Sequence, residues 1–328
     1  MSAAAESEAI MFCASCGVGG DGIKLKNCTA CYLVQYCSLK CQRDHRSKHK
    51  KECKKRAAEL RDEILFKQPE SSCFGDCPIC CLPLPIDGKQ CVFMTCCSKQ
   101  ICVGCCYAYK KRQVEGRLEP KCPFCRKAAL PTYEEQIEQL MKRIEASDPV
   151  AMREMGTEKC NKGDYQAAFD YFTRAVALGN VEAHYELSVM YLTGQGVEKD
   201  GKKELHHVEQ AAIGGHPNAR HNLGCVEWEN GRVDRAAKHF IIASKLGNDR
   251  SLERVKDLYK DGFVNKEDFT AALRGYQTAI NAMKSPQRKE AAEYAEYVAE
   301  HERGLRKERR REERFRKMMM DDAGGEEL

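Results

Sequence analysis

The sequence Cys77-Pro78-Ile79-Cys80 opens a cysteine-rich stretch that closes with Cys122-Pro123-Phe124-Cys125-Arg126. Between these ends lie two more close pairs, Cys96-Cys97 and Cys102 with Cys105. Two intervening residues let both sulfurs of a pair reach one tetrahedral ion from a tight turn. Four close cysteine pairs, three of them with this spacing, therefore predict a small module held together by bound metal.

The cysteine content of the whole chain is high, with 21 cysteines among 328 residues. Residues 1–10 contain neither the basic nor the apolar segment of a secretory signal. No apolar run approaches the roughly 18 residues of a membrane span. In a reducing compartment, paired cysteines are expected to bind metal rather than form disulfides. We therefore expect a protein of the cytosol or nucleus that does not act at a membrane.

A second module with different spacing precedes the first. It contains seven cysteines and one histidine, which is enough for two tetrahedral ions. Its pairs are, in chain order, Cys13 and Cys16, Cys28 and Cys31, Cys37 and Cys41, and His49 and Cys53. The last two pairs have i, i+4 spacing, so both members of each pair lie on one face of a helix.

This second module resembles the MYND zinc finger, including the step Tyr36-Cys37-Ser38 and the residue Gln42. The resemblance implies interleaved binding of two zinc ions. One ion would take Cys13, Cys16, Cys37 and Cys41, and the other Cys28, Cys31, His49 and Cys53. MYND fingers typically dock proline-containing peptides. In the family a tryptophan lines the peptide groove, and Arg46 stands at that position here. Docking of such peptides by this finger therefore stays open.

The stretch from Cys77 to Cys125 resembles a RING finger. The resemblance implies a cross-brace with Cys77, Cys80, Cys102 and Cys105 on a first zinc ion, and Cys96, Cys97, Cys122 and Cys125 on a second. The sequence departs from the family at Cys96-Cys97, because the family separates these ligands by a short gap. Cys91 is the alternative ligand there. Cys73, Cys81 and Cys106 are expected to be spare thiols.

A RING resemblance implies a ubiquitin ligase, which binds a charged conjugating enzyme and orients the ubiquitin tail for attack. Three residues match the family's contact positions for that enzyme and ubiquitin: Ile79, Pro123 and Arg126. The planar guanidinium of Arg126 carries several N–H donors and could hydrogen-bond to the conjugating enzyme and to ubiquitin at once. Each also fits a purely structural role in a small zinc knuckle. Tyr107 and Tyr109 either complete the groove that would contact the conjugating enzyme or pack the RING helix.

The second half of the chain repeats itself in units of 32 to 36 residues. Gly163-Asp164-Tyr165-Gln166-Ala167-Ala168 recurs in the pattern of Gly231 to Ala237, and each unit ends in Gly-Asn or Gly-His. Small alanines allow close helix packing, and glycine provides the left-handed helix end. These units predict a helical solenoid of four repeats over residues 148–281. They resemble Sel1-like repeats, relatives of tetratricopeptides, which implies protein binding on the concave face.

Other polar clusters have weaker functional interpretations. His184, His206, His207 and His221 lack a partner at ligand spacing and are expected to pack between helices. Nine basic residues between Lys40 and Arg56 suggest either a nucleic-acid patch or a solvated helix that offsets the thiolates beside it. The net charge of +5 gives little support for nucleic acid. The run Arg306-Lys307-Glu308-Arg309-Arg310-Arg311 is either a nuclear import signal or part of a solvated helix.

The sequence therefore predicts two small zinc-stabilised α+β modules followed by an all-α solenoid, with four zinc ions in total. The expected segments are a disordered lead (1–10), a MYND-type finger (11–53), a helical linker (54–72), a RING-type finger (73–127), a bridging helix (128–147), Sel1-like repeats (148–284) and a charged tail (285–328). The first functional hypothesis is a RING-type ubiquitin ligase whose repeats and MYND finger recruit proteins. The alternative is a non-catalytic scaffold for protein interactions, and nucleic acid is a third, unfavoured partner.

Overall fold

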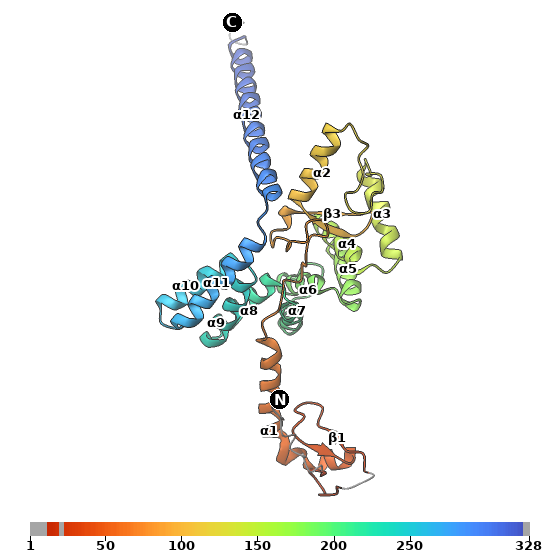
Figure 1. Ribbon diagram of the computed structural model, residues 1–328, viewed down its shortest axis with the longest axis vertical. Coiled ribbons are helices and arrows are strands. Elements are labelled where there is room, and N and C mark those ends of the chain that lie inside the picture. The colour runs from red at the N-terminus through yellow and green to blue at the C-terminus, as the bar shows by residue number, and fades with distance from the viewer. Residues whose placement is uncertain (1–11, 20–22, 324–328) are drawn as a thin grey trace, which may run out of the picture. The chain divides into compact units, whose positions relative to one another are not determined.

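The computed structural model describes residues 12–19 and 23–323. The expected lead at residues 1–10 and the last residues of the expected tail lie outside these ranges. The chain divides between Gln68 and Pro69 into two compact units, whose elements are labelled in Figure 1. Each unit is described by itself.

The first unit is a small finger followed by a long helix. Strands β1 (Lys26–Asn27) and β2 (Gln35–Tyr36) pair antiparallel, with Lys26 opposite Tyr36. Helix α1 (Leu39–Leu65) begins after Ser38, whose hydroxyl accepts a hydrogen bond from the backbone N–H of Cys41. The core of the finger consists of Tyr36 and the ligand cysteines themselves. So small a core is inadequate alone, which fits a module stabilised by metal.

The second unit begins with the stretch that we name the central cysteine module, residues 73–127. A short 3₁₀ turn, η1 (Gly88–Gln90), leads into a hairpin of β3 (Cys91–Met94) and β4 (Lys99–Cys102), and helix α2 (Val103–Glu115) follows directly. The hairpin places Cys91 opposite Cys102. Leu84 and Ile101 supply the apolar part of a core that otherwise consists largely of thiols.

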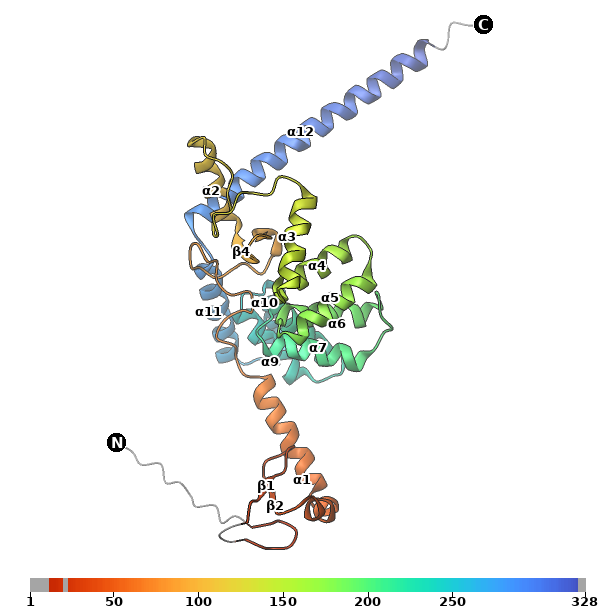
Figure 2. The same cartoon turned by 90° about the vertical axis from the view of Figure 1, so that its right-hand side faces the viewer.

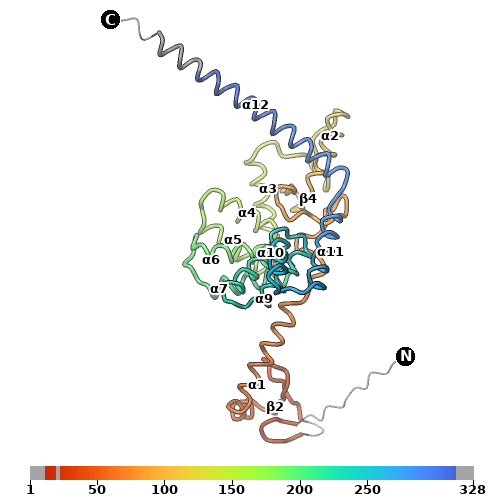
Figure 3. The backbone as a smooth tube through the Cα atoms, turned by 90° about the vertical axis from the view of Figure 1, so that its left-hand side faces the viewer, coloured from red at the N-terminus to blue at the C-terminus, as the bar shows by residue number. Residues whose placement is uncertain are grey.

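Helix α3 (Tyr133–Glu145) precedes the repeats and starts with a capping box between Thr132 and Glu135. Four helix pairs then wind one after another, as the tube in Figure 3 shows. They are α4 (Pro149–Asn161) with α5 (Tyr165–Ala177), α6 (Val181–Thr193) with α7 (Gly201–Ile213), α8 (Pro217–Glu229) with α9 (Val233–Lys245), and α10 (Asp249–Lys260) with α11 (Lys266–Ala282). The predicted all-helical repeat region is confirmed.

The first helix of each pair begins with a side-chain cap at an equivalent position. The four caps are Asp148, Asn180, His216 and Asn248. Each side chain accepts a hydrogen bond from a backbone N–H two or three residues ahead. The imidazole of His216 thus replaces the oxygen that usually fills this role, and its Nδ1 accepts from Ala219.

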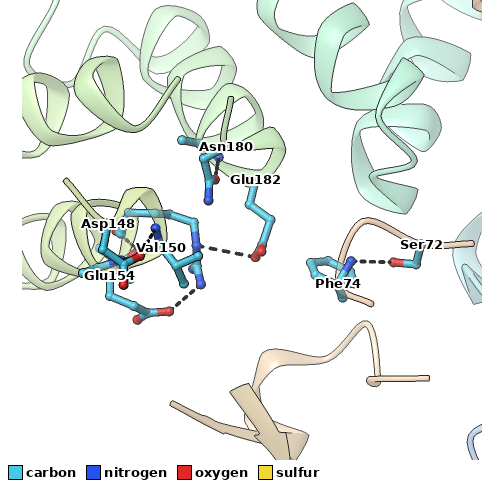
Figure 4. A network of polar contacts seen from close by, with 11 residues as sticks. Ser72, Phe74, Asp148, Val150, Glu154, Asn180 and Glu182 are labelled. Atoms are coloured by element: carbon cyan, nitrogen blue, oxygen red, sulfur yellow. Dashed lines mark hydrogen bonds and ion pairs between the residues drawn. The ribbon is translucent and has the colours of Figure 1, made fainter. Parts of the chain in front are cut away.

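The central cysteine module packs directly against the solenoid. The backbone N–H of Cys73 donates to the carbonyl of Gly215 at 3.2 Å, and the Phe74 ring lies 5.3 Å from that of His216. Nearby, Arg153 forms ion pairs with Glu154 and Glu182, and Figure 4 shows these acidic side chains on neighbouring helices. Phe93 of β3 packs against the core of the first repeats. The module and the repeats therefore share one interface.

Helix α12 (Pro286–Ala323) follows the last repeat and returns to the central cysteine module. Figures 1 and 2 both show its start beside α2, where the ring centroids of Tyr107 and Tyr294 lie 5.1 Å apart. Farther along, residues 301–314 are exposed, as expected of a solvated single helix. None of the helices in the described ranges is long and apolar enough to cross a membrane.

Candidate metal centres

The predicted ligands form four groups of four, and within each group all ligand atoms lie within 4.8 Å of one another. The groups are Cys13, Cys16, Cys37 and Cys41; Cys28, Cys31, His49 and Cys53; Cys77, Cys80, Cys102 and Cys105; and Cys96, Cys97, Cys122 and Cys125. These are the sets that the two family resemblances imply. In both modules the chain alternates between its two groups, so each group ties together distant parts of the module.

The groups of the first unit are built from two turns and one helix. In the first group the Sγ atoms of Cys16 and Cys37 lie 3.7 Å apart, and those of Cys37 and Cys41 3.5 Å. In the second, Nε2 of His49 lies 3.2 Å from Sγ of Cys31. His49 and Cys53 are one helical turn apart on α1, which aims both ligand atoms at the same point.

A buried tyrosine and a second histidine hold the His49 ring in place. The Tyr36 hydroxyl lies 3.1 Å from Nδ1 of His45, and the His45 ring stacks on His49 with centroids 5.8 Å apart. Such outer contacts fix the orientation of a metal-binding imidazole. His45 was not among the predicted site residues, although its position four residues before His49 on the same helix was an available signal.

The adjacent pair Cys96-Cys97 occupies the tight turn of the β3–β4 hairpin. The backbone N–H of Cys97 donates to the carbonyl of Met94, and the next residue, Ser98, has a left-handed φ of 51°. This turn directs both thiols to the knuckle formed by the last pair. Sγ of Cys97 lies 4.0 Å from that of Cys122, and Sγ of Cys96 3.4 Å from that of Cys125. Neighbouring residues can therefore face one site.

Cys91, the alternative ligand, lies outside all four groups. Its Sγ is 3.9 Å from the carbonyl oxygen of Pro85, and burial raises the pKa of its thiol. Cys73, Cys81 and Cys106 also lie outside the groups, as expected of spare thiols. Burial raises the pKa of Cys73 and of Cys106, which keeps both thiols protonated.

Each group contains one thiol whose pKa is lowered by backbone hydrogen bonds. The N–H of Cys37 makes the largest contribution at Cys13, whose pKa falls to about 6. At Cys28 and Cys77 burial raises the pKa, but backbone hydrogen bonds outweigh it and bring the values to about 6 and about 7. The pKa of Cys125 is lowered in the same way. The turns thus stabilise one thiolate per group, and thiolates are the form that binds metal.

Each group also contains at least one thiol whose pKa is raised, so that this thiol resists ionisation without a cation beside it. A hydrogen bond to the Cys41 side chain raises the pKa of Cys37 to about 12, for example. A divalent ion reverses this balance and deprotonates the coordinating thiols. Three sulfur-only groups and one group of three sulfurs and an imidazole nitrogen are donor sets typical of tetrahedral structural zinc. The residues therefore fit four zinc ions.

The proposed contact residues for a conjugating enzyme lie at the surface of the central cysteine module. Ile79 is 40% exposed, Pro123 is half-buried, and Arg126 is exposed. Nη1 of Arg126 lies 3.4 Å from the hydroxyl of Tyr109, and its guanidinium 5.6 Å from the centre of that ring. Tyr107, in contrast, packs against Tyr294. The structure thus separates the two tyrosines: Tyr109 lies beside Arg126, and Tyr107 faces α12.

The solenoid histidines make packing contacts with nearby side chains. Nδ1 of His184 lies 2.9 Å from Nδ1 of His207, and Nδ1 of His221 lies 2.8 Å from the hydroxyl of Ser251. Burial lowers the pKa of His207 and His221 to about 4, so both rings are neutral. Among the described residues, no metal-binding group of three or more ligands is found beyond the four cysteine-rich ones.

The comparisons with known families match two parts of this chain. Residues 13–53 match the MYND finger, and residues 150–180 and 181–216 match the Sel1 repeat. The chain is a zinc-finger and Sel1-repeat protein. Neither match covers the central cysteine module, so its RING resemblance depends on spacing and geometry.

Two curated relatives are both called DAP3-binding cell death enhancer 1. The protein of Mus musculus is 32% identical over 200 residues, covering 49% of this chain and 39% of that protein. The protein of Rattus norvegicus is 33% identical over 189 residues, covering 45% and 37%. The chain thus spans about two fifths of the length of these relatives.

Two solved structures are also similar. A Sel1 repeat protein from Oxalobacter formigenes is 25% identical, with a TM-score of 0.34, and covers 38% of this chain and 98% of its own. A protective antigen of uropathogenic Escherichia coli with the SLR fold is 29% identical, with a TM-score of 0.37, and covers 45% and 33%.

Proposed function

We propose that this protein is a scaffold for protein–protein interaction, in which zinc stabilises the two cysteine-rich modules and the solenoid binds a protein partner. We further propose that it works in the cytosol or nucleus, where reduced thiols remain free to bind zinc. The repeats and the MYND finger both support an interaction role.

The observation that carries the proposal is an open cleft of about 1190 Å³ between the central cysteine module and the later repeats. Residues 85–88 and Gln90 line one side, and the start of α10, the end of α11 and the start of α12 line the other. Ile86, Ile280 and Met283 provide apolar surface, while Asp249 and Lys284 provide charge. A mixed surface of this kind suits a peptide segment or a protruding loop of another protein.

Direct binding tests this proposal, and the name of the curated relatives makes DAP3 the first protein to try. Ile280→Ala removes apolar surface from the cleft, whereas Leu192→Ala truncates an apolar side chain of similar size that is exposed outside the cleft. We expect the first change to weaken binding at least about fivefold, typical of a contact worth 1 kcal/mol, and the second to leave it unchanged. Equal affinities for both variants would rule out the cleft as the binding surface.

A second candidate function is ubiquitin transfer by the central cysteine module. The contact between Arg126 and Tyr109 supports it, because the exposed guanidinium of Arg126 and the half-buried ring of Tyr109 together offer hydrogen-bond donors and an aromatic surface beside the last zinc knuckle. The exposure of Ile79 adds an apolar contact for a conjugating enzyme. Both features also fit a non-catalytic zinc module, so the scaffold remains the leading proposal.

A ubiquitination assay separates the two functions. The full chain is incubated with ubiquitin, activating enzyme and a panel of conjugating enzymes. A ligase should form ubiquitin chains with at least one of them, and Arg126→Ala should abolish this while Lys127→Ala, its exposed basic neighbour, retains it. Lack of chains with every enzyme would leave the scaffold as the function.

A further inference from the structure

Arg288, in the first turn of α12, reaches from the end of the solenoid into the central cysteine module. Its Nη1 donates to the carbonyl oxygens of Pro83 at 2.8 Å and Met283 at 2.7 Å. Its Nη2 donates to the carbonyl oxygen of Leu82 at 3.3 Å and lies 3.6 Å from Sγ of Cys80. The half-buried guanidinium therefore touches both a metal-ligand sulfur and the loop that follows it.

The backbone of α12 approaches this group closely because α2 carries a glycine there. A Cβ at Gly104 would lie 2.6 Å from the backbone nitrogen of Arg288 and 2.8 Å from its Cα. Gly104 directly precedes the ligand Cys105. The two helices are also joined by an ion pair between Lys111 of α2 and Glu290 of α12 at 2.7 Å. Arg288 is thus held at the cluster by the packing of two helices.

The charge of the cluster explains what a guanidinium contributes. Four thiolates around one divalent ion carry a formal charge of about −2. A partly buried negative charge is costly unless cations or hydrogen-bond donors face it. Arginine remains protonated at any physiological pH and presents several donors in a fixed plane. Its contact with Cys80 lowers that cost, and its contacts with Leu82 and Pro83 fix the loop beside the ligand.

We propose that Arg288 is a positioning residue for the Cys77, Cys80, Cys102 and Cys105 cluster, and that it makes zinc retention there depend on the docking of α12. This inference rests on the zinc occupancy proposed above. The repeats would then be coupled to the metal cluster through the helix that follows them. A partner that displaces α12 would weaken one zinc site of the four.

Zinc release from the full-length chain tests the proposal. Three variants are compared with the unchanged protein: Arg288→Gln, Arg288→Lys and Lys289→Gln, whose side chain is exposed. An excess of a coloured chelator reports each ion as it leaves. Loss of an outer contact typically weakens metal binding about 10- to 100-fold, so one ion in Arg288→Gln should leave faster by a comparable factor. Arg288→Lys should be intermediate, and Lys289→Gln should match the unchanged protein.

A second measurement distinguishes this role from a purely mechanical one. In protein reconstituted with Co²⁺, the sulfur-to-cobalt charge-transfer band reports hydrogen bonding to the thiolates. We expect the band to shift in Arg288→Gln and to return towards its original position in Arg288→Lys. If Arg288→Gln lowers the melting temperature while the band and the release rates stay unchanged, Arg288 only pins α12 to the loop and the proposal is wrong.

Native mass spectrometry of the unchanged protein and of each variant before chelation distinguishes the role proposed for Arg288 from the zinc assignment on which it rests. Four zinc ions in each protein, followed by unaltered release in Arg288→Gln, would overturn the role of Arg288 alone. Fewer than four ions in the unchanged protein would instead overturn the zinc assignment of one cluster.

Discussion

Gly224 lies against the face of Phe240, so that a Cβ added at Gly224 would come within 2.5 Å of the ring. The same relationship occurs two helix pairs earlier, where a Cβ at Gly156 would lie 2.6 Å from the Phe172 ring. Both glycines lie on the first helix of a pair and both rings on the second. Glycine at this position therefore sets the distance between the helices of a repeat.

Gly224→Ala should destabilise the solenoid because the added methyl group would clash with the buried Phe240 ring, which would have to shift. Overpacking of this kind typically costs about 1–3 kcal/mol. Gly201→Ala is the matched control, since a Cβ there meets nothing within 4 Å. Thermal unfolding followed by circular dichroism should show a lower midpoint for the first variant only. A normal midpoint for Gly224→Ala would mean that the repeat can widen at little cost.

Buried neutral histidines should make the solenoid lose stability on acidification. Burial lowers the pKa of His216 and of His239 to about 3. The unfolded chain binds a proton near pH 6.5 whereas the folded chain does not, so stability is fully present above that pH and falls as the pH drops towards 3. Each histidine contributes a slope of up to about 1.4 kcal/mol per pH unit in that window.

Unfolding by urea between pH 7.5 and 5.5, with zinc present, measures this slope. His216→Asn keeps a helix-capping side chain and should reduce the slope, as should His239→Asn. His301→Asn changes an exposed histidine of α12 and serves as the control. Equal slopes in all four proteins would show that acid acts through other groups, such as the metal ligands.

The second cluster of the central cysteine module should lose its ion when Cys97 is changed. Cys97 belongs to the group with Cys96, Cys122 and Cys125, while Cys91 hydrogen-bonds to a carbonyl outside it. Native mass spectrometry should therefore count three zinc ions in Cys97→Ser and four in Cys91→Ser. The reverse result would make Cys91 the ligand and exclude the adjacent pair.

Much of this architecture was predictable because its signals are local. The spacing of the cysteine pairs predicted two metal-binding modules, and the resemblances to known zinc fingers implied the four groups. Glycine and alanine positions predicted the helix pairs. The turn that lets Cys96 and Cys97 act together was not predictable, since it depends on the left-handed conformation of Ser98 in a hairpin. The contact of Arg288 with Cys80 joins residues 208 positions apart, and the local sequence around neither residue indicates it. Local patterns reveal ligands, whereas the contacts that surround them depend on tertiary packing.

Removal of zinc should unfold the cysteine-rich modules while the repeats remain helical. The core of the first finger consists of Tyr36 and ligand cysteines, so it loses its support when the ions leave. The two solenoid cores contain none of the proposed ligands and are filled by residues such as Phe172 and Phe240.

Hydrogen exchange after chelation should thus show lost protection in residues 23–53 and 77–126 and retained protection in α5 to α10. Because Phe93 packs on the first core, α3 and α4 should lose part of their protection. Full loss throughout the repeats would mean that the zinc modules hold the solenoid together, and retained protection in the fingers would mean that they fold without metal.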